Sequence, residues 1–146
     1  RVGHRKWFEL DIIHATTSGK SPLQKKFQLG SPAVLRGYPQ QTNLSDDHLL
    51  ASRLDFKFPL ITKPLWGMLS AFKIQGTVFY DQGKIWSEKI SYEKAKHREN
   101  AGMGIEWTLD TASLFQVPLK IEVAFPLNDP DYKKPQFILL GVLTGS

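Results

Sequence analysis

Residues 53–58 read Arg-Leu-Asp-Phe-Lys-Phe and alternate a charged side chain with a large apolar one. A β-strand places successive side chains on opposite faces, so this stretch predicts a strand with one charged face and one apolar face. The same period of two runs through three further segments and opens the chain more weakly, while the last segment is apolar on both faces. We therefore predict six strands, at residues 6–15, 48–59, 69–81, 101–110, 117–126 and 136–144.

The lengths of these strands and of their connections favour a membrane barrel. Each predicted strand has about 9–13 residues, longer than the usual five or six of a soluble sheet and close to the length that crosses a bilayer. Short connections at 60–68 and 111–116 alternate with long ones at 16–47 and 82–100, and a middling one follows at 127–135; short turns on one side and long loops on the other are typical of outer-membrane barrels. Tyrosine and tryptophan near the predicted strand ends suit membrane–water interfaces (Trp7, Trp66, Tyr80 and Trp86).

Alternation alone leaves a second fold open. In a soluble β-sandwich the apolar face is the core, whereas in a barrel that spans lipid the apolar face points outward and the charged face lines a wet interior. We predict an all-β, antiparallel, up-and-down transmembrane β-barrel, and we keep a soluble β-sandwich binding module as the alternative.

The composition excludes several classes of protein. A hydrophobic fraction of 41% in 146 residues excludes a disordered chain. The absence of cysteine excludes disulfides, thiolate zinc sites and a cysteine nucleophile. No apolar run reaches the length of a membrane-spanning helix. The net charge of +5 is spread along the chain and gives no reason to expect a nucleic-acid partner. The sequence begins at Arg1 without a methionine or an apolar signal segment, so we expect a mature, processed or recombinant chain.

Residues 27–38, Phe-Gln-Leu-Gly-Ser-Pro-Ala-Val-Leu-Arg-Gly-Tyr, resemble a known loop. The similar loop is the Leu/Val-Arg-Gly-Tyr/Phe motif of the bacterial surface-antigen superfamily, which includes BamA, TamA, the two-partner secretion transporters and the organellar import barrels. The resemblance continues in order through residues 53–60, 76–86, 101–105 and 121–127, and the second of these stretches carries an aromatic-x-Asp-x-Gly ending. It therefore covers nearly the whole chain.

The resemblance implies a place within a larger barrel. Residues 1–146 would be the C-terminal part of a single outer-membrane barrel domain, its last six or so strands of a 16-stranded barrel, without the POTRA repeats and the N-terminal strands. Six strands alone cannot close, because the smallest closed barrels use about eight. The family's last strand usually ends in an aromatic residue, whereas residues 141–146 here contain none, so we expect a trimmed C-terminus or a weakened assembly signal.

The resemblance also implies roles for individual residues. Arg36 would be the inward-reaching arginine at the tip of a loop that folds into the lumen, with Asp55 and Asp81 as its acidic partners. Leu35, Gly37 and Tyr38 complete the loop motif, and Gly83 would be a turn glycine. Independently of the family, Asp55 and Asp81 fall on the polar faces of neighbouring predicted strands. Two carboxylates on one face can share the planar fork of a guanidinium, which a lysine cannot reproduce.

The function implied by the resemblance is the insertion and assembly of outer-membrane proteins, or the translocation of protein across the outer membrane of a bacterial cell. A two-partner secretion pore and the barrel anchor of a passenger enzyme remain alternatives. The implied partners are nascent outer-membrane or secreted proteins, outer-membrane lipid including lipopolysaccharide, and accessory lipoproteins. We expect no cofactor, no metal and no enzymatic activity.

Other motifs give weaker indications of chemistry. Residues 14–21 end like a phosphate-binding loop but carry His14 where glycine is needed. The four histidines lack metal-ligand spacing. Residues 46–47 and 129–131 carry aspartate pairs that suit either calcium or a turn, and we favour turns. The lysine-rich stretch 87–100 suits either lipopolysaccharide phosphates or a solvated loop, and its interspersed glutamates favour the loop. No nucleophile–base–acid set is visible.

Overall fold

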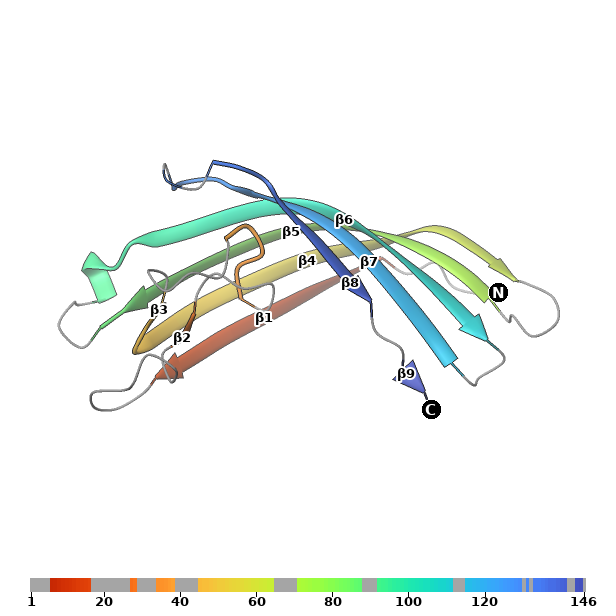
Figure 1. Ribbon diagram of the computed structural model, residues 1–146, viewed down its shortest axis with the longest axis horizontal. Coiled ribbons are helices and arrows are strands. Elements are labelled where there is room, and N and C mark those ends of the chain that lie inside the picture. The colour runs from red at the N-terminus through yellow and green to blue at the C-terminus, as the bar shows by residue number, and fades with distance from the viewer. Residues whose placement is uncertain are drawn as a thin grey trace.

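The computed structural model describes residues 6–16, 27–28, 34–38, 45–64, 71–87, 92–111, 115–129, 131, 133–141 and 144–145. Six strands form the main path of one antiparallel sheet in the order β1-β4-β5-β6-β7-β8. They are β1 (Trp7–Thr16), β4 (His48–Pro64), β5 (Ala71–Trp86), β6 (His97–Thr111), β7 (Phe115–Pro126) and β8 (Gln136–Gly141). Figure 1 shows that the sheet is strongly curved and does not close on itself. The prediction of an all-β, up-and-down antiparallel fold is confirmed.

Three very short strands and one helical turn complete the described structure. β2 (Phe27–Gln28) pairs with β3 (Ser45–Asp46) as a separate two-stranded sheet within the connection from β1 to β4. β9 (Thr144–Gly145) pairs with β7, and the 3₁₀ turn η3 (Tyr92–Lys94) precedes β6. The β2–β3 pair lies in a segment that we predicted to be loop throughout. The described part of the chain contains no helix with the length and hydropathy of a membrane span.

The central strands β4, β5 and β6 are longer than the sequence pattern predicts. Each remains paired with its neighbours beyond the residues in which apolar and polar side chains alternate. β5 continues to Trp86, which pairs with His48, and β6 begins at His97, which pairs with Lys84. The predicted loop 82–100 therefore shrinks to residues 87–96. Trp86 does end a strand, whereas Tyr80 lies inside β5 and Trp66 is outside the described residues.

The alternation of short and long connections remains with these new boundaries. Residues 65–70 and 112–114 join strands at one end of the sheet, while 17–47, 87–96 and 127–135 join them at the other. A β-bulge interrupts β4 between Pro59 and Ile61. Because proline has no N–H to donate to the ladder, an irregularity at this position is the expected response.

The sheet exposes its apolar face and buries its polar face, which is the reverse of the arrangement in a soluble protein. Large apolar side chains of β1, β6 and β8 are exposed, including Phe8 (71% exposed), Met103 (59%) and Phe137 (80%). The buried side chains of the other face are mainly polar or charged (Asp55, Thr77, Asp81, Asn100 and Glu122). Among the described residues, no second sheet covers the apolar face. This distribution is that of a lipid-facing exterior and a polar interior rather than of half a sandwich.

Residues 34–38, the orange loop in Figure 1, lie against one part of the polar face. Leu35 and Tyr38 pack with Leu49 of β4 in a small apolar cluster, and parts of β1 and β5 surround it. The cluster is placed on the same face as the buried carboxylates, so it fixes the loop at the point where Arg36 meets them.

Candidate functional site

Three buried carboxylates come from three different strands and share one face of the sheet. Asp55 lies on β4, Asp81 on β5 and Glu122 on β7, and their exposed fractions are 7%, 0% and 1%. The pairing register relates them, because Asp81 is opposite Asn100 of β6 and Glu122 is opposite Gly104. Side chains that differ by an even number of ladder positions point the same way. The alternating pattern of the three strands therefore places three carboxylates close together on the polar face of the sheet.

Arg36 binds all three carboxylates from the loop above them. Its Nε and Nη2 donate to the two oxygens of Asp81 at 2.9 and 2.5 Å, and its Nη1 and Nη2 donate to the two oxygens of Asp55 at 3.2 and 2.5 Å. Nη1 also donates to Oε1 of Glu122 at 3.1 Å. Two bidentate contacts and a third acceptor use all the N–H donors of the guanidinium, and the side chain is 1% exposed.

Further cations balance the charge of this cluster. Lys120 Nζ lies 2.8 Å from Oε1 of Glu122, and Arg53 Nε lies 3.9 Å from Oδ1 of Asp81. Burial alone would lower the pKa of Arg36, but its hydrogen bonds to Asp81 and Asp55 and their charges more than offset this, so the pKa is raised. Arg36 therefore stays charged. The removal of one partner would leave buried charge without compensation, which is costly.

Phe79 and Asn100 shape the space around the guanidinium. The ring of Phe79 lies under Arg36 with its centroid 3.6 Å from Cζ, and Asn100 Nδ2 donates to Oδ2 of Asp81 at 3.0 Å. Glycine is required at two nearby positions. A Cβ on Gly37 would stand 2.5 Å from Cβ of Asn100, and a Cβ on Gly102 would stand 2.4 Å from the Phe79 ring.

Tyr38 fixes the loop at a second point. Its hydroxyl lies 3.1 Å from the carbonyl oxygen of Glu99 and 3.3 Å from Oδ1 of Asn128. The Asn128 side chain in turn accepts from the Glu99 N–H at 2.9 Å and donates to the His97 carbonyl at 3.0 Å. Burial raises the pKa of Tyr38 to about 12. The loop is thus held at two places. One is the carboxylate cluster, and the other is the contact of Tyr38 with Glu99 in β6 and Asn128 in the connection after β7.

A family model described as the Omp85 superfamily domain matches residues 3–142 of this sequence, which is nearly all of it. The chain belongs to the Omp85 superfamily. The resemblance to the BamA- and TamA-containing surface antigens is thereby confirmed. Neither a curated protein nor a solved structure matches the chain significantly. Membership implies the bacterial outer membrane as the location and, in general, a role in inserting outer-membrane proteins or translocating protein.

The sequence-predicted site residues of this Omp85 chain divide into two groups. The structure brings Arg36, Asp55 and Asp81 into direct contact, and it places Leu35 and Tyr38 in the apolar cluster beside them. Gly83 is different. The prediction of a turn glycine is wrong, because Gly83 lies inside β5 opposite Ala51 and Arg98, in a strand that both neighbours extend.

Sequence reasoning missed Glu122, Asn100 and Phe79. Glu122 had a usable signal, because it alternates with Ile121 and Val123 and therefore falls on the polar face of its strand. Asn100 lay in the predicted loop 82–100, so nothing in the sequence indicated that it pairs with Asp81 in the sheet. Phe79 is a large aromatic residue on the polar face, and only the arginine above it explains why it lies there.

Among the described residues, the weaker motifs of the sequence lie mostly apart from this Omp85 site, although Asn100 at the end of the lysine-rich stretch belongs to it. Asp129 is buried, and it accepts from Lys96 Nζ and Arg98 Nε, each at 3.0 Å, and from the Asp131 N–H at 3.1 Å. Burial acts to raise the pKa of Asp129, but these hydrogen bonds outweigh it and the pKa is lowered. Its contact with Asp131 is the turn that the sequence suggested. Residues 17–26, which hold most of the phosphate-loop-like stretch, are outside the described residues, and His14 lies in β1.

Proposed function

We propose that this chain is part of an outer-membrane barrel of the BamA/TamA type, which inserts and assembles outer-membrane proteins. In this proposal the six strands of the main sheet are the C-terminal strands of a 16-stranded barrel, completed by strands that pair with the open edges of the sheet. The observation that carries the proposal is the contact of Arg36 with Asp55, Asp81 and Glu122. It ties a loop across the wall on the polar face, while the opposite face is apolar and exposed.

The loop acts as a brace in this proposal and performs no covalent chemistry. Arg36 joins β4, β5 and β7, so it holds the curvature of the wall across four neighbouring strands. A wall of fixed curvature presents its edge strands in a fixed register. This favours a barrel that opens and closes at one seam instead of deforming throughout.

When this seam opens, the free edge of β8 is the surface that a substrate strand can bind. β8 pairs with β7 on one side, and no described strand pairs with its other side. It is also short, since six residues pair along a β7 of twelve. An unpaired edge recruits a further strand through its backbone N–H and C=O groups. We propose that nascent outer-membrane proteins add their strands here, with outer-membrane lipid around the wall and accessory lipoproteins as further partners.

A depletion experiment in the native host tests the function. The chromosomal gene is placed under a repressible promoter, and a plasmid supplies the full-length wild-type protein or its Arg36→Ala variant. We expect depletion to reduce the amount of folded outer-membrane proteins, measured as heat-shifted bands on unboiled gels, and wild type but not the variant to restore it. If depletion left those proteins unchanged but stopped the export of one secreted protein, a two-partner secretion pore would replace this proposal.

A further inference from the structure

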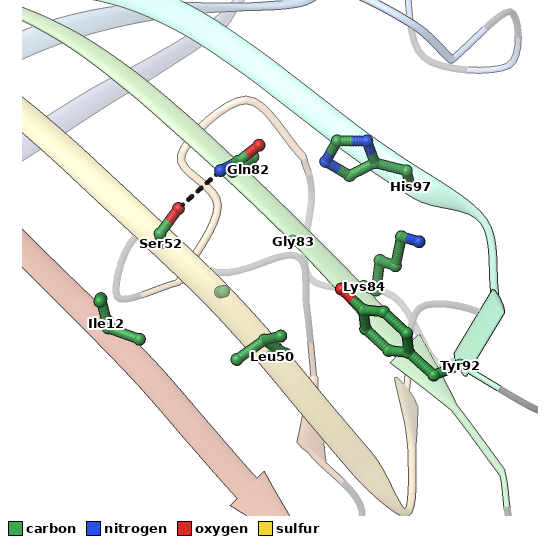
Figure 2. Close-up of a pocket in the computed structure, with 9 residues that line it drawn as sticks. Ile12, Leu50, Ser52, Gln82, Gly83, Lys84, Tyr92 and His97 are labelled. Carbon is green, nitrogen blue, oxygen red and sulfur yellow. Dashed lines mark hydrogen bonds between the residues drawn. The ribbon is translucent and has the colours of Figure 1, made fainter.

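A cavity of about 330 Å³ lies on the outward face of the sheet, away from the Arg36 site. Ser52, Gln82, Lys84 and His97 line it from β4, β5 and β6, and Tyr92 of η3 lies beside them (Figure 2). Ser52 and Gln82 differ by even numbers of positions from the exposed apolar residues Leu54 and Val78, so they share the outward face. We call this the rim cavity.

The rim cavity begins where the apolar band ends. Across β4, β5 and β6 the register places Leu54, Tyr80 and Ala101 in one row. The next outward row is polar, with Ser52, Gln82 and Glu99, and the row after it holds Leu50, Lys84 and His97. Lys84 and His97 flank the connection 87–96, which is at the long-loop end of the strands. In a barrel this is the outer surface of the membrane.

Aromatic side chains mark the same level. Trp86 stacks on His48 with ring centroids 5.4 Å apart, and Tyr92 meets the edge of Trp86 at 5.1 Å. Tryptophan and tyrosine concentrate at membrane–water interfaces, where an apolar ring and a polar group are both accommodated. The cavity therefore lies at the depth of the lipid headgroups and above the acyl chains.

Lys84 is the cation of this cavity that has no acidic partner among the described residues. Its Nζ lies 4.4 Å from the centroid of the Tyr92 ring, a contact that holds the ammonium group at the cavity, and no hydrogen bond joins it to another of the described residues. His97 differs, because its Nδ1 lies 3.3 Å from Oε1 of Glu99. Gln82 Nε2 donates to Ser52 Oγ at 3.0 Å and keeps a second amide hydrogen and the serine hydroxyl for a ligand.

We propose that the rim cavity binds the phosphate group of an anionic lipid of the outer leaflet. Lys84 supplies the charge, Ser52 and Gln82 supply neutral donors, and the lipid's acyl chains extend over the apolar band below. The inference rests on the proposed function, because it requires the sheet to be the wall of an outer-membrane barrel. It adds a site, a ligand class and a leaflet to that proposal.

The test uses the full-length protein purified in detergent, titrated with lipid A and followed by native mass spectrometry. We expect Lys84→Gln to weaken binding about tenfold, because a charge-assisted contact to phosphate is lost, and Lys84→Arg to retain it. Dephosphorylated lipid A should bind the wild type as weakly as lipid A binds Lys84→Gln. Lys94→Gln is the matched control, since Lys94 is an exposed lysine of η3 that does not line the cavity.

Two results would overturn the site. One is equal binding by wild type, Lys84→Gln and Lys94→Gln. The other is competition by millimolar inorganic phosphate as effective as that by lipid A, which would indicate a general anion site without lipid recognition. The same samples are run boiled and unboiled on a gel. A wild type that shows the heat shift of a barrel without Lys84-dependent binding refutes this inference alone, and a wild type with no heat shift refutes the proposed function together with it.

Discussion

Arg36 and Glu122 stand 86 positions apart in the chain, yet Nη1 of one lies 3.1 Å from Oε1 of the other. The same Nη1 donates to Asp55 on β4, three strands away from β7 in the sheet. One atom of the loop thus joins two strands that share no backbone hydrogen bond. This contact makes the loop a brace of the wall.

Arg36→Lys should impair the full-length barrel nearly as much as Arg36→Ala. An ammonium group is a point charge and cannot make two bidentate contacts, so two of the three carboxylates lose their geometry. Breaking a buried ion cluster typically costs about 3–5 kcal/mol. The measurement is the heat-shifted fraction of the protein in outer membranes. A lysine variant that matched wild type would show that charge alone is needed.

Asp81→Asn should destabilise the barrel more than Glu122→Gln. Asp81 accepts two bonds from the Arg36 side chain and one from Asn100, whereas Glu122 accepts one from Arg36 and retains Lys120 beside it. The free energy of unfolding in lipid vesicles, from urea titration, gives the order. Gln75→Glu, a charge change on the same face outside the cluster, is the control. Equal losses in the free energy of unfolding for the two variants would contradict the larger contribution that we assign to Asp81.

Gly37→Ala should prevent the loop of residues 34–38 from packing against the polar face of the sheet. The new Cβ would meet Cβ of Asn100 at 2.5 Å, and neither backbone segment is free to move away because Arg36 and Asp81 hold them. We expect increased cleavage of the loop by added protease together with a smaller heat-shifted fraction. Asn100→Gly in the same chain removes the clashing atom and should restore part of the protection. Full protection in Gly37→Ala alone would contradict the close approach.

Tyr38→Phe should cost about 1 kcal/mol at neutral pH, since it removes the hydroxyl contacts to Glu99 and Asn128 but leaves the ring in its cluster. The pKa of Tyr38 is raised from 10.0 to about 12, so the folded state favours the protonated phenol. Its contribution is full below pH 10 and is lost as the pH rises toward 12. Unfolding followed from pH 8 to 12 should show a decline that is smaller in Tyr38→Phe. Tyr92→Phe, an exposed tyrosine, is the control.

The sequence allowed the sheet and half of the site to be predicted, because both depend on local alternation. Asp55 and Asp81 are on the polar faces of strands that follow one another, so a shared partner was visible. Glu122 is on the polar face too, but its contact with Arg36 depends on how far the loop extends across the sheet. The alternation of residues within a strand does not predict this distance. Gly83 was misplaced for a related reason. The end of β5 is set by partners on β4 and β6, and alternation within one strand does not reveal them.

The most direct test of the account asks which face of the sheet meets lipid. In the full-length protein, reconstituted in vesicles and carrying no other cysteine, a fluorophore is attached to Val78→Cys or to Gln75→Cys. Val78 is on the exposed apolar face, and Gln75 is on the face of Arg36. We predict that a lipid-borne quencher dims the label at position 78, and that aqueous iodide dims the label at position 75. Quenching of the label at 78 by iodide alone would contradict the membrane barrel and favour a soluble sheet.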